Sequence, residues 1–209
     1  MNTSGVDNPD LAAAAALELD DDGEAARVRV VGARQAGQAF ERARLVDVEL
    51  VRCDLSGCDF SESVWHRVRL VDCRASSIEL PQTQLYDVTF EDCKLDDANL
   101  RMAKLTRVRF ADSVLAGAEL VAAALEEVSF AGSDLAGADV SNARCAQVDL
   151  RNARLDDLLG LVSLKGSTIG FDQLVGLAPA LALALGFAVR ADDEPEPEPT
   201  PRPVRRPPA

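Results

Sequence analysis

The side chains that could carry out chemistry are one histidine and five cysteines, and their spacing matches no common catalytic or metal site. His66 directly follows Trp65, and no spacing in the chain brings a serine or cysteine nucleophile beside it, so we expect a surface residue. Cys53, Cys73 and Cys93 recur at one regular spacing, but a structural zinc needs four ligands that converge as a tetrahedron. The sequence therefore predicts no catalytic residue, no metal site and no cofactor.

Two other chemistries remain as alternatives. Carboxylates on the outer surface could serve an enzyme or a metal-binding protein. Bound metal, or a melting temperature lowered by chelator, would support that hypothesis, and their absence would leave a scaffold. The three cysteines are expected to form a column about 4.8 Å apart, within the range that a disulfide allows. The glycines Gly57, Gly117, Gly132 and Gly137 do not form a phosphate-binding loop and are expected at backbone corners.

Composition limits the classes of partner. The 209 residues are 47% hydrophobic, and 35 acidic against 22 basic residues give a net charge of −13. Such a charge disfavours direct binding to nucleic acid or to an anionic membrane and favours protein partners. No uninterrupted apolar stretch is long enough to span a bilayer, and the alanine-rich run at 11–17 lacks the basic flank of a secretory signal. With an odd number of cysteines, these features predict a cytoplasmic protein.

The strongest pattern in the sequence is a repeat of five residues. Every fifth residue from Phe40 to Leu155 is apolar, at 24 positions in succession, and the residues two positions earlier are all small or β-branched. We expect this series to form an internal ladder. Its large members include Leu50, Leu55, Phe60, Trp65, Leu70, Phe90, Leu95, Phe110, Phe130 and Leu150.

Neither a helix nor a straight strand keeps such a series on one side. Steps of five scatter the residues around a helix, whose apolar stripe needs spacings of three and four, and an odd step along a strand alternates between its two faces. The chain must therefore turn a corner in every repeat. Valine recurs at Val48, Val68 and Val88 with a spacing of 20, so four repeats should complete one square coil. Residues 40–159 then form about six coils and a rod about 29 Å long.

The segments AGAEL (116–120), AGSDL (131–135), AGADV (136–140) and LDDANL (95–100) resemble the A(D/N)LxG motif of pentapeptide repeat proteins. The resemblance covers residues 40–159 and implies an all-β solenoid, a right-handed quadrilateral β-helix. Some members of this family protect against quinolones, resemble DNA in shape and charge, and bind DNA gyrase. If that role applied here, Asp59, Glu79, Glu119 and Asp139 would stand in for phosphates. Basic residues in the middle coils argue against DNA mimicry, because DNA is uniformly negative. They are Arg67, Arg69, Arg101, Lys104, Arg107 and Arg109.

The regions on either side of the repeat have different compositions. We expect a disordered or partly helical leader at 1–24, an irregular cap or first strand at 25–39, the β-helix at 40–159, a C-terminal cap at 160–190 with a helix at 172–186, and a disordered proline-rich tail at 191–209. The leader helix would begin near Asp10. The five-residue frame is expected to fail at Gln35 and Gln38, where polar residues replace the apolar and small ones. The tail is a candidate docking segment for proline-binding domains.

The C-terminal helix should carry an apolar stripe. Asp172 is a candidate N-cap, Pro179 is expected to restart the helix, and Gly186 to end it. The stripe contains Leu174, Leu177, Leu181 and Leu185, at spacings of three and four. It could cover the last coil or meet a second copy of the chain, and the cap alone is favoured.

Charged residues just before each interior position should point outward in columns. One column contains Asp59, Glu79, Asn99, Glu119 and Asp139; another contains Arg44, Val64, Gln84, Lys104, Ala124 and Arg144. One face of the rod is thus expected to be anionic and another cationic, the latter suited to an acidic partner. The leading hypothesis is a non-enzymatic scaffold that binds an unidentified protein through these faces. Gyrase binding as a DNA mimic is the narrower alternative.

Overall fold

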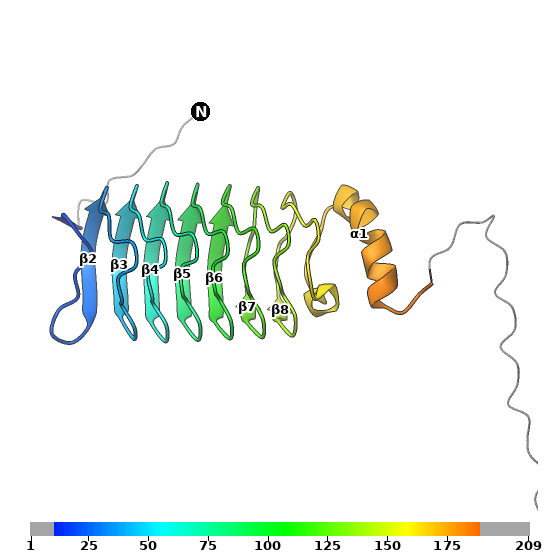
Figure 1. Ribbon diagram of the computed structural model, residues 1–209, viewed down its shortest axis with the longest axis horizontal. Coiled ribbons are helices and arrows are strands. Elements are labelled where there is room, and N and C mark those ends of the chain that lie inside the picture. The colour runs from blue at the N-terminus through cyan, green and yellow to red at the C-terminus, as the bar shows by residue number, and fades with distance from the viewer. Residues whose placement is uncertain (1–10, 189–209) are drawn as a thin grey trace, which may run out of the picture.

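The computed structural model describes residues 11–188 and is a rod of stacked parallel coils with a helix at one end (Figure 1). The elements are β1 (Ala12–Ala14), β2 (Glu24–Val31), β3 (Arg44–Val51), β4 (Val64–Val71), β5 (Gln84–Glu91), β6 (Lys104–Ala111), β7 (Ala124–Glu126), β8 (Arg144–Ala146), the 3₁₀ helix η1 (Leu161–Leu164) and α1 (Phe171–Ala184). The eight strands form one sheet in sequence order, and every pairing is parallel. The expected fold class, a β-solenoid with a short C-terminal helix, is confirmed.

The period of four repeats sets the register between coils. Leu50 pairs with Leu70, and Leu70 pairs with Phe90, so like positions stack at the parallel-strand spacing of about 4.8 Å. The strands β2 to β8 each begin one coil, which makes about seven coils rather than six. The additional coil includes residues 25–39, where an irregular cap or first strand was expected. The first strand is present as β2, but it is regular, because it pairs with β3 in the same register as the later strands.

The corners depend on residues with left-handed backbone conformation. In each repeat the second residue after the interior position has a positive φ, as at Asp47 (56°), Arg67 (54°) and Asp87 (56°). Such values are uncommon for residues other than glycine. Within residues 11–188, 21 non-glycine residues adopt them. Burial of the ladder offsets the cost of this conformation, because each corner turns the next interior side chain toward the inside.

Stacked side chains fill the inside of the rod. The ten large ladder residues from Leu50 to Leu150 are each at most 1% exposed. The rings of Phe90, Phe110 and Phe130 stack with centroids 4.8 and 5.0 Å apart. Each buried Leu or Phe stabilises the fold by roughly 1.5–3 kcal/mol. The interior is thus a packed core, and any binding surface must lie outside it.

The N-terminal end of the rod is closed by residues before the first coil. Leu17 is 1% exposed and covers the core, and Gln35 is buried at an interior position of the ladder. The Gln35 amide accepts a hydrogen bond from the Leu17 backbone N–H (2.7 Å) and donates one to its carbonyl (2.8 Å). The frame therefore continues through Gln35, against expectation. Where a helix was expected from Asp10, the chain forms β1, which pairs with β2.

The C-terminal end is closed differently. α1 begins after an N-cap at Gly170, not at Asp172, and continues through Pro179. Gln173 donates hydrogen bonds to the carbonyls of Leu150 (2.7 Å) and Ala153 (2.6 Å) in the last coil. Within residues 11–188, no helix has the length and apolarity needed to cross a membrane. The expected tail at 191–209 and the first ten residues of the leader lie outside the described part of the chain.

Candidate protein-docking face

The anionic column predicted from sequence exists as a column in space. Consecutive members are bridged as parallel neighbours: Asp59 with Glu79, Glu79 with Asn99, Asn99 with Glu119, and Glu119 with Asp139. All five residues are half-buried on one flat face of the rod. We call these five residues the anionic column. It places four carboxylates along about 19 Å, one per strand step except at Asn99.

Three of the four carboxylates form no ion pair within residues 11–188. Asp59 accepts hydrogen bonds from the backbone and hydroxyl of Ser61, and Glu79 accepts one from the Asn99 amide at 2.6 Å. Asp139 accepts from the backbone N–H of Ser141 at 2.8 Å.

The fourth carboxylate, Glu119, forms an ion pair with Arg101 at 2.8 Å. The hydrogen bonds from Ser61 hold the pKa of Asp59 below its ordinary value, so that carboxylate is ionised at neutral pH. Most of the negative charge on this face is therefore available to a partner.

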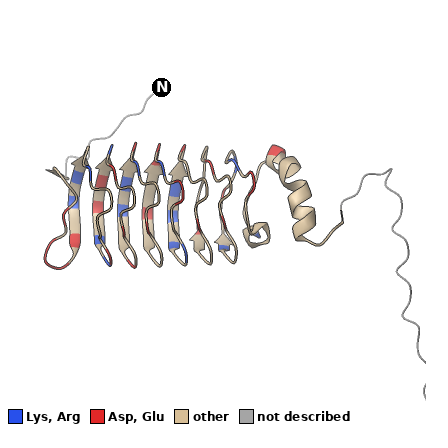
Figure 2. Ribbon diagram, in the orientation of Figure 1, with Lys and Arg blue, Asp and Glu red and all other residues tan. Residues whose placement is uncertain are grey.

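The expected cationic column is weaker than the sequence suggested. Register places Arg44, Lys104 and Arg144 in one row, but the row begins with Glu24, which forms an ion pair with Arg44 at 3.2 Å. In Figure 2, β2 and β3 carry both signs of charge, β4 and β6 carry only basic residues, and β5 carries only acidic ones. This side of the rod is mixed in charge.

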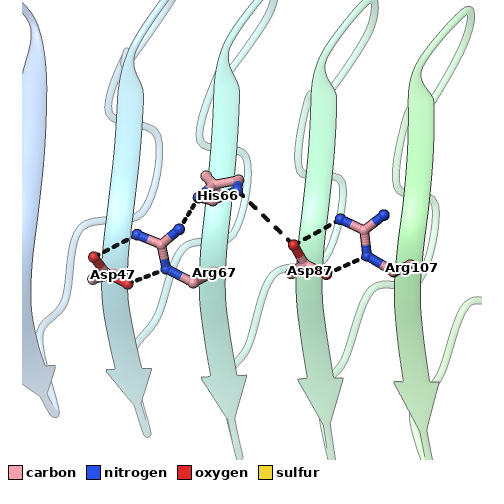
Figure 3. Close-up of polar contacts among 5 residues, drawn as sticks. All are labelled: Asp47, His66, Arg67, Asp87 and Arg107. Atoms are coloured by element: carbon pink, nitrogen blue, oxygen red, sulfur yellow. Dashed lines mark hydrogen bonds and ion pairs between the residues drawn. The ribbon is translucent and has the colours of Figure 1, made fainter.

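A ladder of opposite charges runs along one corner of the rod and was not anticipated from the sequence (Figure 3). The Arg67 guanidinium donates two hydrogen bonds to Asp47 (2.5 and 2.7 Å), and Arg107 donates two to Asp87 (2.5 and 2.9 Å). These bonds hold the pKa of both aspartates below the ordinary range. His66 lies between the pairs, accepting from Arg67 and 3.9 Å from Asp87. The alternation of sign at equivalent positions of successive coils was the signal that could have revealed this ladder.

A second ionic group is more buried. Glu49 is 6% exposed and contacts Arg29 at 2.9 Å and Arg69 at 3.0 Å, while Arg69 also contacts Glu91 at 2.7 Å. Since each acid here faces an arginine one coil away, the group joins adjacent coils. Like the corner ladder, it is suited to hold the stack together and leaves little charge unpaired.

The cysteine column is part of the core. Cys53, Cys73 and Cys93 are at most 2% exposed, and their thiols donate to backbone carbonyls such as Leu50 O (3.3 Å) and Glu91 O (3.3 Å). The hydrogen bond with Cys73 and burial both raise the pKa of the Cys53 thiol. The pKa of the Cys93 thiol is instead lowered, chiefly by its hydrogen bond with Cys73. The burial of all three thiols favours a packing role.

The apolar stripe of α1 is divided between two surroundings. Leu177 and Leu181 pack against the core, whereas Leu174 is 45% and Leu185 is 63% exposed. No residue of α1 is buried, and a cavity of about 320 Å³ lies between α1 and η1, lined by Leu161, Ile169 and other apolar side chains. The helix covers the last coil incompletely.

A filled square solenoid with a charged outer face defines a class of protein: a rigid scaffold whose surface, and not its interior, is available for contacts. Residues 43–120 match the sequence profile of the pentapeptide repeat region, and residues 129–157 match that of pentapeptide repeats in eight copies. The chain belongs to the pentapeptide repeat family. No curated protein sequence matches the chain significantly.

Several solved structures are similar to this chain. A trypsin-treated variant of QnrB1, a plasmid-mediated fluoroquinolone resistance protein, is 21% identical, with 78% of this chain and 99% of that chain covered and a TM-score of 0.38. HetL, which is involved in heterocyst differentiation regulation in the cyanobacterium Nostoc sp. PCC 7120, is 17% identical over 69% of this chain and 86% of its own, with a TM-score of 0.27. A pentapeptide repeat protein from the Arabidopsis thaliana thylakoid lumen is 23% identical over 60% and 74%, with a TM-score of 0.26. At these identities the functions of those proteins do not transfer to this chain.

Proposed function

We propose that this protein is a non-enzymatic scaffold that binds another protein against its anionic column. The observation that carries this proposal is that Asp59, Glu79 and Asp139 form no ion pair within the described residues and bond to serine, asparagine and backbone donors. Asp59 and Asp139 also hold the corner, because each accepts the backbone N–H two residues on. Like charges stacked at strand spacing destabilise a sheet slightly, so turn formation alone does not explain a stack of four carboxylates. A partner with basic side chains at a similar spacing would neutralise it.

The test compares capture of partners on two versions of the full chain. Glu79→Lys with Asp139→Lys reverses the charge of the column, and Asp72→Lys with Asp92→Lys makes the same change of charge at a corner outside the column. We expect a partner that binds wild type and the corner variant but not the column variant. Equal binding to all three proteins, measured with purified partner, would contradict the proposal.

DNA gyrase is the narrower candidate partner. The rod from residue 41 to 160 carries 22 acids and 14 bases, a net charge of −8 over about 29 Å. A DNA duplex of that length carries about 17 phosphate charges. Whole-surface imitation of DNA is therefore incomplete, and any mimicry would rest on the anionic column alone.

Gyrase supercoiling and quinolone-induced cleavage assays decide this point. Mimicry predicts that micromolar protein inhibits supercoiling or protects gyrase from cleavage, and that Glu79→Lys with Asp139→Lys abolishes the effect. Absence of any effect, or full activity of the variant, would remove gyrase as the partner while leaving the broader scaffold proposal intact.

We also propose that α1 joins two copies of the chain. Phe171, Val175 and Leu183 are 78%, 63% and 67% exposed, and the only charged residue of the helix is Asp172. An apolar surface of this kind marks a contact site. Sedimentation analysis should give a dimer for wild type and a monomer for Val175→Lys with Leu183→Lys, with unchanged circular dichroism. A monomeric wild-type protein would contradict this assignment.

A further inference from the structure

The end of the rod at α1 contains a cavity that the packing of the chain leaves unfilled. It has a volume of about 320 Å³ and lies between η1 and α1, and small-molecule sites have volumes of roughly 300–1,000 Å³. Its walls are apolar. They include Leu161, Leu164 and Ile169 on one side and Leu177, Leu181 and Leu185 on the other.

The cavity is long and narrow. Leu177 and Leu185 lie about 12 Å apart along the axis of α1, and a volume of about 320 Å³ over that length gives a channel about 5 Å across. That width is close to the thickness of one extended hydrocarbon chain. Val162 and Leu185 line the channel and are 59% and 63% exposed, so the channel opens to solvent and a ligand can enter there.

The lining contains two polar side chains. Lys165 is exposed and forms no ion pair within residues 11–188. The other is Ser167. Burial raises the pKa of the Cys145 thiol, and the nearby Ser167 hydroxyl lowers it. That hydroxyl is itself buried and forms no regular hydrogen bond within the described residues. An unpaired buried hydroxyl is costly, so it gains from an acceptor that a ligand brings in.

A larger hollow against a different side of α1 has the opposite charge. It has a volume of about 760 Å³, and its lining includes Asp156, Asp157 and Asp172. The arginine of that lining, Arg154, is already paired with Asp156 at 2.7 Å. A negatively charged ligand is therefore repelled from that hollow and attracted to the cavity that contains Lys165.

We propose that the cavity between η1 and α1 binds one free fatty acid, with its hydrocarbon chain in the apolar channel and its carboxylate beside Lys165. Burying an unpaired charge is costly, and the exposed Lys165 ammonium lets the carboxylate pair while it stays in contact with water. The walls of the channel are leucines and other apolar side chains from both η1 and α1. A bound chain thus fills the gap under α1 and holds the helix against the last coil.

This assignment goes beyond the proposed scaffold function and does not depend on it. The anionic column ends at Asp139, before η1 and α1 begin. Phe171, Val175 and Leu183, which we propose as the contact between copies, do not line the cavity. If the fatty acid binds but no partner depends on the anionic column, the docking function has failed and this assignment has not.

Calorimetric titration of the full chain with decanoate, below its critical micelle concentration, tests the site. We expect one molecule bound per chain, a negative heat-capacity change, and a raised melting temperature. Dodecanoate and octanoate test the channel: each methylene added should tighten binding about fourfold until the channel is full. Absence of binding, or an affinity that does not depend on chain length, would overturn the proposal.

The place of the carboxylate is tested with Lys165→Met, which keeps the aliphatic stem and removes the charge. We expect this variant to bind decanoate about threefold more weakly than wild type, and to bind 1-decanol as wild type does. Lys104→Met makes the same change on β6, outside the cavity, and should bind both probes like wild type. Equal effects of the two substitutions would overturn the assignment of the carboxylate to Lys165.

The place of the hydrocarbon chain is tested by filling the cavity. Ala184 lines it, whereas Ala178 is exposed and does not. We expect Ala184→Trp to weaken decanoate binding at least tenfold and Ala178→Trp to leave it unchanged, with the circular dichroism of wild type in both. Undiminished binding by the folded Ala184→Trp protein would overturn the proposal, because the chain would then lie elsewhere.

Two other occupants of the cavity are distinguished in the same experiments. If decanoate binds the variant with Val175→Lys and Leu183→Lys but not wild type, a second copy of the chain fills the cavity and the proposal is wrong. Sedimentation of wild type with phosphatidylglycerol vesicles, without binding of decanoate, would identify a membrane surface as the ligand and would overturn it equally.

Discussion

Trp65 is the largest side chain inside the rod, and its position shows how one residue constrains its coil. It is fully buried, it meets the ring of Phe60 edge-on at 5.0 Å, and its indole Nε1 has no hydrogen-bond partner within residues 11–188. A buried donor of this kind costs about 1–3 kcal/mol. Ala75, ten residues later, is the only alanine among the large ladder positions from Phe40 to Leu155, which indicates that the indole takes space that a leucine would otherwise fill.

Exchanging the two volumes tests this packing. We expect Trp65→Leu alone to lower the free energy of unfolding by about 2 kcal/mol through a cavity, and Ala75→Leu alone to lower it by about 1–3 kcal/mol through overpacking. The double variant should recover most of both losses, because two leucines fill the coil and no indole N–H is buried. Urea melts of the four proteins measure this coupling. Strictly additive losses would show that the two side chains do not share space.

The corner glycines are not equivalent. Gly132 has φ 70°, and a Cβ there would lie 2.2 Å from Asp112 Oδ1, whereas Gly57 has φ 64° and open space around it. Gly57→Ala should therefore cost only the left-handed backbone strain, about 1 kcal/mol. Gly132→Ala should cost clearly more, because the Asp112 side chain must also move. Thermal melting of the two variants gives the comparison, and equal melting temperatures would show that Asp112 yields without cost.

At the level of the strands, the corner ladder joins β3 to β4 and β5 to β6. The carboxyls of Asp47 and Asp87 have pKa values below the ordinary value of about 4, chiefly because Arg67 and Arg107 donate to them. A depressed folded-state pKa contributes stability that is present above the unfolded pKa and is lost as pH falls through the folded one. The two pairs should thus stabilise the stack at neutral pH and cease to do so in acid.

The prediction concerns the double variant Asp47→Asn with Asp87→Asn. Wild type should melt at a higher temperature than the variant at pH 7, and the difference should shrink below about pH 4 as the wild-type carboxyls take up protons. The effect will be small, because the aspartate side chains are 31% and 37% exposed. Asn tolerates the left-handed conformation, so the backbone is unaffected. A difference that is the same at pH 7 and about pH 2.5 would exclude an ionic origin.

The strands could be predicted from the sequence because their cause is periodic. The spacing of 20 between Val48, Val68 and Val88 fixes the register, and the structure has β3, β4 and β5 in that register. The ends could not be predicted in this way, because their causes are individual contacts. Gln35 is polar and was expected to break the frame. Its side-chain amide forms hydrogen bonds with both backbone groups of Leu17, so its burial leaves neither group of the amide unpaired.

The candidate face was predictable as a column but not as a source of free charge. Sequence spacing alone places Glu79 beside Asn99 and Asp139 beside Glu119. It does not show that Arg101 neutralises Glu119 while Ser141 leaves Asp139 charged. Those outcomes depend on side-chain conformations at corners, where residues from neighbouring coils meet. The face available to a partner is therefore a property of the folded rod.

For the whole molecule, stability is that of a one-dimensional stack, in which each coil contacts its neighbours and one continuous core runs through all of them. Phe110 lies in the middle of that core, fully buried and stacked at 4.8 and 5.0 Å between two other rings. Glu119, about two corners further along the chain, is half-buried and faces outward. The same substitution at these two positions should have opposite consequences.

We expect Phe110→Arg to abolish the cooperative melt, since it buries an unpaired charge in a filled core and separates the stack into two shorter rods. Glu119→Arg should melt within a few degrees of wild type, because surface substitutions usually change stability by less than about 0.5 kcal/mol. Circular dichroism at increasing temperature distinguishes the two. A folded Phe110→Arg protein would mean that position 110 can turn outward, and the square coil with an inward ladder would then be the wrong description of this chain.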